Sequence, residues 1–404
     1  MKQLSILLNG RNVGDIVMAR SGAITFKYAP EWLSLSGTFP ISLSLPLNER
    51  GYQGAPVIAY LENLLPDNQA IRERVASKVN ASGLDAFSML EKIGGDCVGA
   101  LQFIPSGNGK IHGLNLEGEE VSEADIAHIL RDLKADPLGI KGDDDFRISI
   151  AGAQEKTALL LVNNQWLRPV GMTPTTHIFK TQLGRLPNGI DLQDSVENEF
   201  FCMKFCEFMG LDIAKVEICQ FEDVKALVID RFDRRWVSNE KLMRIPQEDF
   251  CQAMAIPPSQ KYQADGGPNI VQCMDLLKAS NQPTRDQTAF IKAQILFWLL
   301  GATDGHAKNF SISLEPGGFN MTPFYDILSA QKALDDGQIQ LRQMKLAMSV
   351  GDDNKYRMDA VAVRHFLQTA KKSKFGLPLV QQLLRGTLSG IDTAIEETIQ
   401  ALPD

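Results

Sequence analysis

Residues 301–310 read Gly-Ala-Thr-Asp-Gly-His-Ala-Lys-Asn-Phe and follow a strongly apolar segment, residues 295–300. This stretch places a carboxylate, Asp304, five positions before a carboxamide, Asn309. A second carboxylate, Asp326, comes further along the chain. Because glycine, aspartate and asparagine favour turns, an exposed loop after a helix is the simplest interpretation of this stretch.

The spacing of these polar side chains also fits a loop that transfers phosphate. Asp304 would accept the proton of an attacking hydroxyl, while Asn309 and Asp326 would hold a metal ion against the phosphates of a nucleotide. Protein kinases separate the corresponding Asp and Asn of their catalytic loop by the same four residues. The rest of the chain must therefore distinguish a plain loop from a phosphotransfer site.

Two segments upstream carry features expected of a phosphate-binding lobe. Residues 151–156 (Ala-Gly-Ala-Gln-Glu-Lys) have small side chains, which let backbone N–H groups approach phosphate oxygens. The Walker A spacing is absent, so a tight hairpin loop is the alternative. Lys180 ends a strand-like run, where it would reach the phosphates, and a helix with Glu197 and Glu199 follows and would pair with it.

The segment Asp230-Arg231-Phe232 ends a further strand-like run and enters a charged turn. Backbone groups at such a strand end suit the edge of an adenine, and Phe232 would stack on the ring. A charged β-turn with an aromatic anchor is the alternative. A small-residue loop, a strand lysine, this strand end and the Asp-Asn pair follow one another in the order that kinases use, which favours phosphotransfer.

The distribution of strands and helices predicts an α+β protein with a kinase-like two-lobe architecture. We expect an N-terminal α+β subdomain over 1–135, a small-lobe sheet with phosphate loop and hinge over 136–245, and a helical C-terminal lobe over 246–404. Asn9-Gly10 predicts a hairpin turn and Ser122 a helix N-cap. Strands are expected near 4–8, 13–18, 23–28, 41–45, 146–150, 157–162, 177–180, 216–219 and 226–230. Helices are expected near 56–65, 123–133, 195–209, 247–255, 269–279, 286–301, 360–371, 377–386 and 390–401.

Composition limits the classes of function. A net charge of −8 argues against a free-standing nucleic-acid binder, whose surface would be basic. None of the six cysteines forms a C-x2-C pair, so we expect reduced thiols and no zinc site. We find no signal peptide and no apolar run of the roughly 20 residues that a membrane span needs. A cytoplasmic protein without membrane contact is expected.

Longer strings of sequence carry a family resemblance. They lie at residues 25–33, 63–67, 145–149, 151–160, 174–178, 231–236, 246–249, 301–310 and 322–327. With these strings the chain resembles the HipA-type serine/threonine kinase toxins of bacterial toxin–antitoxin pairs, in particular their enterobacterial members. The resemblance spans nearly the whole chain, and it implies a kinase fold, ATP and Mg²⁺ as cofactors, and a protein substrate.

The resemblance implies a role for each candidate residue. Asp304 would be the catalytic base, and Asn309 and Asp326 the magnesium ligands. Ser149 would be the serine that the kinase phosphorylates on itself. The ATP-binding residues would be Ala151, Gly152, Ala153, Gln154, Glu155, Lys156, Lys180, Asp230, Arg231, Phe232, His306, Ala307, Lys308, Asn309, Tyr325 and Asp326.

Regulation and partners are also implied by the resemblance. A phosphate on Ser149 adds about −1.5 to −2 charge beside the ATP phosphates, so the loop would leave the site and the kinase would be switched off. The substrate would be an aminoacyl-tRNA synthetase, typically the glutamyl enzyme. A HipB-like helix-turn-helix antitoxin would carry the toxin onto operator DNA, with Lys371 and Lys374 near the DNA; a solvated helix end is the alternative for these lysines.

Two other functions remain to be weighed against an active kinase toxin. The first is a catalytically idle binding module that acts as co-repressor with its antitoxin. The second is a lipid kinase of related architecture, which the lack of a basic amphipathic helix weakens.

Overall fold

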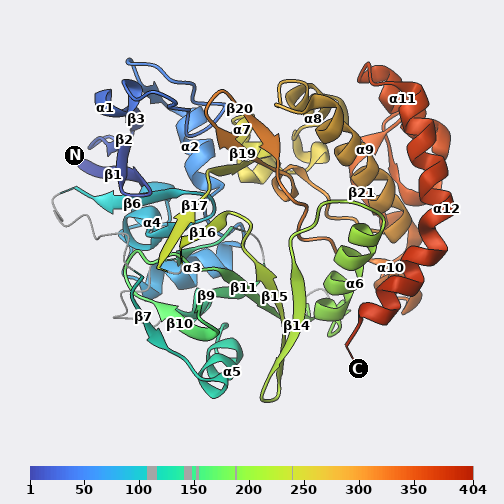
Figure 1. Ribbon diagram of the computed structural model, residues 1–404, viewed down its shortest axis with the longest axis horizontal. Helices are drawn as coiled ribbons and strands as arrows, with labels where there is room; N and C mark the ends of the chain where they lie inside the picture. Colours follow the sequence, from blue (N-terminus) through green and yellow to red (C-terminus); the bar gives the residue numbers. More distant parts are fainter. Residues whose placement is uncertain (107–115, 141–147, 152–153, 187–188, 239, 404) are drawn as a thin grey trace. The chain divides into compact units, whose positions relative to one another are not determined.

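The computed structural model describes residues 1–106, 116–140, 148–151, 154–186, 189–238 and 240–403 (Figure 1). The chain forms two compact units. Unit 1 consists of residues 1–181, 219–259 and 313–317, and unit 2 of residues 182–218, 260–312 and 318–404. The architecture is α+β, as predicted, while the three-part division of the chain stays a prediction.

Unit 1 begins with an antiparallel sheet in the order β4-β3-β2-β1-β6. Asn9 and Gly10 both adopt positive φ, 48° and 81°, which is the type I′ geometry predicted for the first hairpin. The predicted strand at 41–45 is wrong. The hydroxyl of Tyr28 replaces a strand partner there, because it accepts from Ile41 N and donates to Leu45 O. The strands are β1 (Lys2–Leu8), β2 (Arg11–Met18), β3 (Ile24–Tyr28), β4 (Tyr52–Gln53) and β6 (Leu101–Pro105).

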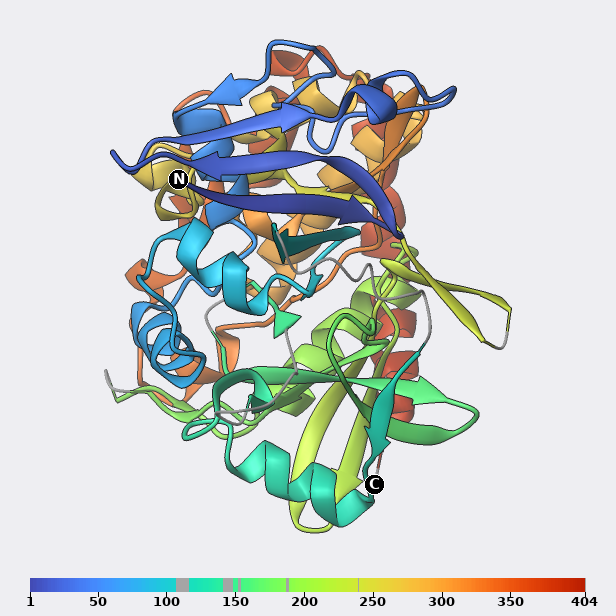
Figure 2. The same cartoon turned by 90° about the vertical axis from the view of Figure 1, so that its left-hand side faces the viewer.

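A second sheet contains the strands predicted near 157–162, 177–180, 216–219 and 226–230 (Figure 2). Its order is β14-β15-β11-β9-β10-β7, and the described part of the strand predicted near 146–150 lies outside it. The helix α5 (Glu123–Arg131) covers it through a shared apolar core. As predicted, α5 opens at a capping box, in which Ser122 and Asp125 bond each other's backbone N–H. The strands are β7 (Gly118–Glu120), β9 (Lys156–Val162), β10 (Gln165–Pro169), β11 (His177–Thr181), β14 (Val216–Phe221) and β15 (Val224–Asp230).

Short elements connect the two sheets of unit 1. Strand β5 (Asp96–Cys97) pairs in parallel with β8 (Ile148–Ser149). The helix predicted at 247–255 is shorter than expected, since β18 (Gln247–Asp249) occupies its first residues and Asp249 caps α7 (Phe250–Ala253). The other elements are α1 (Pro30–Leu33), α2 (Ala55–Glu62), α3 (Gln69–Lys78), α4 (Ala86–Ile93), β16 (Arg234–Ser238) and β17 (Lys241–Arg244).

Unit 2 is mostly helical, as expected for a C-terminal lobe. The two helices predicted at 377–386 and 390–401 are one continuous helix, α12 (Leu377–Ala401), drawn in red in Figure 1. Its buried side chains recur on one face through both predicted segments, so tertiary packing overrides the two glycines at their facing ends, Gly386 and Gly390. The other helices are α6 (Ser195–Phe208), α8 (Ile270–Leu277), α9 (Pro283–Leu300), α10 (Gln331–Asp335) and α11 (Val363–Lys372). The short strands are β12 (Gly184–Arg185), β13 (Asp191–Leu192), β19 (Ser311–Glu315, crossing from unit 2 into unit 1), β20 (Gly318–Met321), β21 (Lys345–Val350) and β22 (Lys355–Arg357).

All six cysteines are thiols in the structure, which confirms that prediction. In the part of the chain that the structure describes, no helix is long and apolar enough to cross a membrane.

Candidate active site

Two glycines fix the loop that carries Asp304 against α9. Gly301 ends the helix in the left-handed conformation, with φ of 68°, which glycine adopts without strain. A Cβ atom on Gly305 would lie 2.5 Å from Cδ2 of Phe297, so only glycine allows the loop to approach the helix this closely. Residues 301–310, called the catalytic loop below, are therefore held by α9 rather than free in solvent.

Asn309 joins the two candidate residues that bear carboxylates, Asp304 and Asp326. Its side-chain Nδ2 donates to the backbone O of Asp304 at 2.8 Å and to the backbone O of Asp326 at 3.5 Å. Asp326 has φ of 61°, a strained conformation for a residue other than glycine. Because Nδ2 is engaged, Oδ1 is the atom of Asn309 left for a ligand; no hydrogen bond to it occurs among the described residues.

Tyr325 braces the catalytic loop from the next segment. Its hydroxyl donates to the backbone O of Lys308 at 2.9 Å and lies 2.5 Å from Oγ of Ser311. Lys308 and Asn309 are both buried. The structure thus brings Asp304, His306, Ala307, Lys308, Asn309, Tyr325 and Asp326 together in unit 2. Their contacts to a nucleotide stay predictions.

His306 lies beside the candidate base. Its Nε2 is 3.8 Å from Oδ1 of Asp304, whose side chain is 52% exposed, whereas the side chain of His306 is 4% exposed. Burial lowers the pKa of His306, so its ring is neutral near pH 7. Its Nδ1 is buried without a hydrogen-bond partner among the described residues. This favours the neutral tautomer in which Nε2 carries the hydrogen.

Sequence reasoning missed one residue at this site, Tyr262. Its hydroxyl donates a hydrogen bond to Oδ1 of Asp304, and its ring meets the ring of His306 edge to face at 4.8 Å. The surrounding residues 260–268 contain two glycines, one aspartate and one proline, a composition typical of a loop. An aromatic residue in such a loop was the available signal.

The metal ligands predicted in unit 2 have the chemistry that Mg²⁺ requires. Asn309 and Asp326 offer amide and carboxylate oxygens, and Mg²⁺ prefers oxygen ligands. No group of three or more His, Cys, Asp or Glu that could hold a metal occurs among the described residues. A magnesium ion would therefore need nucleotide oxygens and water to complete its coordination, as is usual for Mg²⁺ in kinases.

Unit 1 holds the residues predicted to bind phosphate. Lys156 and Lys180 occupy directly opposed positions on the neighbouring strands β9 and β11, and both are buried. Directly opposed residues of antiparallel strands have Cβ atoms about 4.5–5.5 Å apart, so the two lysine side chains start from adjacent positions. Lys156 Nζ donates to the backbone O of Ala151 at 2.8 Å. Gly152 and Ala153 lie outside the described residues.

The side chains of Gln154 and Glu155 are engaged within unit 1. Gln154 Nε2 donates to the backbone O of Thr181 at 2.9 Å. Glu155 forms an ion pair with Arg74. A contact of these two residues with phosphate would therefore come from their backbone N–H groups.

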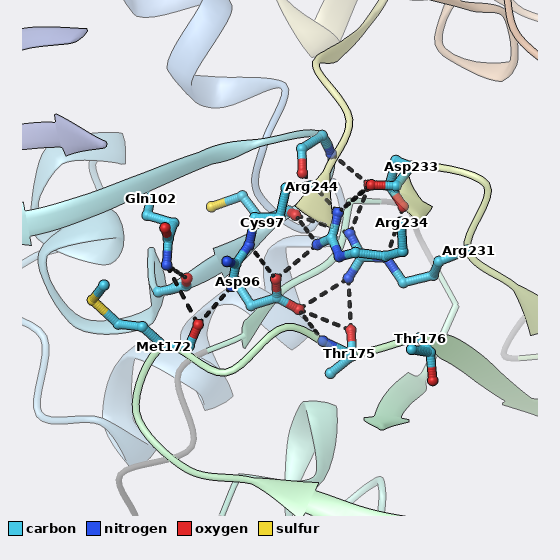
Figure 3. Close-up of polar contacts among 12 residues, drawn as sticks. Asp96, Cys97, Gln102, Met172, Thr175, Thr176, Arg231, Asp233, Arg234 and Arg244 are labelled. Carbon is cyan, nitrogen blue, oxygen red and sulfur yellow. Dashed lines mark hydrogen bonds and ion pairs between the residues drawn. The ribbon is translucent and has the colours of Figure 1, made fainter. Parts of the chain in front are cut away.

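The first two residues of the predicted hinge, Asp230 and Arg231, are both held by side-chain contacts. Asp230 lies opposite His177 in the sheet, with Oδ1 3.0 Å from His177 Nε2. Arg231 was predicted to contact ATP, but its guanidinium is buried and bonds Asp96, Thr175, Asp233 and the backbone O of Cys97 (Figure 3). Only the backbone of Arg231 is thus left for a nucleotide. Phe232 is half-buried.

Arg231 belongs to a buried charge network of unit 1, formed by Asp96, Arg231, Asp233, Arg234 and Arg244 (Figure 3). Burial alone would raise the pKa of Asp96, but the guanidiniums of Arg234, Arg231 and Arg244 hold it well below its usual range. Burial lowers the pKa of Arg244 to about 10. Burial would also raise the pKa of Asp233, but Arg231 and Arg234 lower it, so both aspartates are ionised at neutral pH. The network therefore holds three cations and two anions.

Ser149, the predicted autophosphorylation site, is fully buried in unit 1. Its Oγ donates to the backbone O of Leu64 at 2.7 Å, and its strand pairs with β5 at Cys97. In this conformation the hydroxyl is covered by protein and engaged in a hydrogen bond. Phosphorylation of Ser149 would require β8 to leave its partner first.

The basic residues predicted near DNA lie at the end of α11. Lys371 and Lys374 are both exposed, and Lys374 has φ of 55°. Cations are also favoured at a helix C-terminus by the helix dipole, so their position fits the solvated-end interpretation as well as DNA contact.

Comparison with known proteins links both units to one family. The model described as the HipA-like C-terminal domain matches residues 148–402, and the HipA N-terminal domain model matches residues 4–104. A putative kinase, Y4mE of Sinorhizobium fredii, is 33% identical over 100% of this chain and 93% of its own length. The serine/threonine-protein kinase toxin HipA of Shewanella oneidensis is 28% identical over 97% of this chain and 89% of its own.

A solved structure shows the same fold. It is the Shewanella oneidensis complex of HipA, HipB and operator DNA, which superposes with a TM-score of 0.83 at 24% identity. The superposition covers 99% of this chain and 92% of that one.

Proposed function

The chain belongs to the HipA family of serine/threonine-protein kinase toxins, and from this premise we propose that Asp304 is the base that activates the acceptor hydroxyl for transfer of the γ-phosphoryl group of ATP. The observation that carries this proposal is the position of Asn309, whose amide bonds the backbones of both Asp304 and Asp326. A plain loop has no need to join two carboxylate-bearing residues in this way.

The candidate site residues of unit 2 would each have a distinct role. Asp304 would accept the proton of the attacking serine or threonine hydroxyl at a carboxylate oxygen. Asn309, through Oδ1, and Asp326 would hold Mg²⁺, which neutralises the phosphate charge when it is bound. His306, neutral and buried beside Asp304, would add no positive charge to compete with the metal.

The residues proposed to bind the phosphates and the adenine lie in unit 1. The buried lysines Lys156 and Lys180 would bind the phosphates, and backbone N–H groups of residues 151–156 would add further donors. The backbone of Asp230 and Arg231 would contact the adenine, since the guanidinium of Arg231 is held in the charge network.

Phosphotransfer tests the proposal directly. The wild-type chain, with Mg²⁺ and radiolabelled ATP, should label itself or dephosphorylated casein, and Asp304→Asn should lose at least about 10²-fold of this activity because the base is gone. Lys371→Gln, a change at an exposed residue outside the site, is the matched control and should keep the rate. Absence of transfer by the wild-type chain would favour the idle co-repressor instead.

The biological role proposed is that of a toxin in the cytoplasm, acting on an aminoacyl-tRNA synthetase. The glutamyl enzyme is the candidate that the family resemblance implies. Purified synthetases can be incubated with the wild-type chain and Mg-ATP and assayed for reduced aminoacylation; the Asp304→Asn protein serves as control. A panel of synthetases that all stay active would contradict this part of the proposal.

A HipB-like antitoxin and operator DNA are the proposed partners. The fold shared with the Shewanella toxin, which was solved with HipB and operator DNA, supports this proposal. Since the chain itself is acidic, the antitoxin would supply most of the DNA affinity.

Autophosphorylation at Ser149 is proposed as the off switch. Its burial in this structure means that the loop must open before the serine can react. Mass spectrometry after incubation with Mg-ATP should find phosphate on Ser149 in the wild type, and Ser149→Ala should stay active for longer. Equal decay of activity in the two proteins would contradict the switch.

A further inference from the structure

Residues 260–268 form a support for the catalytic loop. The backbone O of Lys261 accepts a hydrogen bond from Ala307 N at 3.2 Å. The next residue, Tyr262, packs its ring against His306 and donates its hydroxyl hydrogen to Asp304 Oδ1. Two consecutive residues thus contact three residues of the catalytic loop, one through the backbone and the other through a side chain.

This support is itself anchored within unit 2. Gln263 exchanges hydrogen bonds with Ser349 of β21, from Nε2 to Ser349 Oγ at 2.9 Å and from Ser349 N to Oε1 at 2.8 Å. The segment also folds tightly on itself, because a Cβ on Gly267 would lie 2.2 Å from the backbone O of Gln260. Tyr262 is therefore presented from a fixed backbone.

Asp304 needs such a contact. Its side chain is about half exposed and stands on a loop, so water alone would leave the carboxylate free to rotate. A hydrogen bond to a charged acceptor is roughly twice as strong as one between neutral groups, which is enough to favour one rotamer. With Oδ1 occupied by the Tyr262 hydroxyl, Oδ2 is the oxygen that stays available to a substrate hydroxyl.

We propose that Tyr262 is a positioning residue for phosphotransfer, which orients the carboxylate of Asp304 through Oδ1 and leaves Oδ2 to accept the proton of the substrate. This inference rests on the kinase activity proposed above. It extends the site to a residue whose proposed role is exerted only through the base.

The variant Tyr262→Phe isolates the hydroxyl, because the ring that packs on His306 is kept. Tyr356→Phe is the matched control, since Tyr356 also lies in unit 2 and its hydroxyl makes no hydrogen bond to the described residues. Misplacement of a catalytic group by about 1 Å can cost 10²-fold in rate, so we expect a 10- to 100-fold lower kcat for Tyr262→Phe. KM for ATP and the Kd of Mg-ATP should stay within about twofold of wild type, and Tyr356→Phe should match wild type throughout.

Two measurements on full-length proteins decide the matter. The first is the rate of phosphate transfer to dephosphorylated casein, with kcat and KM separated and Mg-ATP binding measured by titration. The second is hydrogen–deuterium exchange of peptides that cover residues 302–310, which needs no catalysis. Exchange in these peptides should be faster in Tyr262→Phe than in wild type or Tyr356→Phe.

The outcomes separate this inference from the proposed function. A wild-type chain that binds Mg-ATP but transfers no phosphate contradicts the kinase proposal, and a lack of faster exchange in Tyr262→Phe then overturns the role of Tyr262 independently. An active wild type with an equally active Tyr262→Phe overturns the positioning role alone. Loss of Mg-ATP binding together with kcat would show that the tyrosine is only structural.

Discussion

Asp96 is the residue on which the buried charge network of unit 1 depends. It accepts from three arginines and is itself buried. Replacing one partner of a buried ion pair leaves an uncompensated charge, which typically costs about 3–5 kcal/mol. We therefore expect Asp96→Asn to lower the free energy of unfolding by about that amount, measured by urea denaturation.

Asp223 provides the control for this prediction. It also pairs with an arginine, Arg131, but on the exposed surface. Exposed ion pairs contribute little to stability, so Asp223→Asn should leave the denaturation midpoint nearly unchanged. Equal destabilisation by the two variants would show that burial does not increase the contribution of these ion pairs to stability.

Glu248 predicts a pH dependence. It is fully buried; Oε1 accepts from Leu43 N at 2.8 Å, while Oε2 has no hydrogen-bond partner among the described residues. Burial raises its pKa to about 8. Between the ordinary pKa of glutamate and about 8, Glu248 is protonated in the folded state and ionised in the unfolded state. The stabilisation from this proton is therefore fully present below the ordinary pKa and is lost as pH rises through about 8.

The variant Glu248→Gln should remove this dependence, because glutamine is neutral at every pH. We expect the difference in melting temperature between Glu248→Gln and wild type to grow in favour of the variant from pH 5 to pH 8.5. A difference that stays constant over this range would contradict the burial of an ionisable carboxyl.

At the scale of the element, α12 shows what local sequence signals can and cannot determine. The predicted helices near 377–386 and 390–401 end and begin at glycines, which weaken a helix interior, yet the helix continues because its buried face packs within unit 2. Likewise the strand predicted at 41–45 fails because one tyrosine hydroxyl, distant in sequence, takes the backbone groups. Both errors come from tertiary contacts that a local pattern does not contain.

Gly386 allows a direct test of that explanation. A Cβ there would find no described atom within 4 Å, so Gly386→Ala should stabilise the protein by about 0.5–1 kcal/mol through helix propensity alone. Gly210→Ala is the opposite control, since Gly210 has φ of 81° and alanine would be strained there. Thermal denaturation of the two variants should shift in opposite directions.

Local patterns were sufficient where the chemistry is local. The Asn9-Gly10 turn and the Ser122 capping box are set by neighbouring residues, and both predictions are confirmed. For the candidate site, the sequence predicted only residues that lie within its recognisable motifs. Tyr262, far from the motif in sequence, and the diversion of the Arg231 side chain into the charge network depend on contacts that require the fold.

At the scale of the whole molecule, the acidic chain should reach DNA only with a partner. Suppose that Lys371 and Lys374 bind operator phosphates, and that both are changed to Glu. In a plot of log K for DNA binding by the antitoxin complex against log salt concentration, the slope should then become shallower by about 0.9 for each phosphate that is no longer neutralised. Kinase activity should not change. An unchanged salt slope would identify these lysines as a solvated helix end.

The charge network also constrains how this chain could be recombined with its relatives. Asp96 lies within residues 4–104, the part matched by one family domain, whereas Arg231, Arg234 and Arg244 lie within residues 148–402, the part matched by the other. A chimera that takes its N-terminal domain from a relative without a carboxylate at this position would bury three guanidiniums with one anion, Asp233. The two family domains are therefore expected to be inherited and exchanged as a single piece.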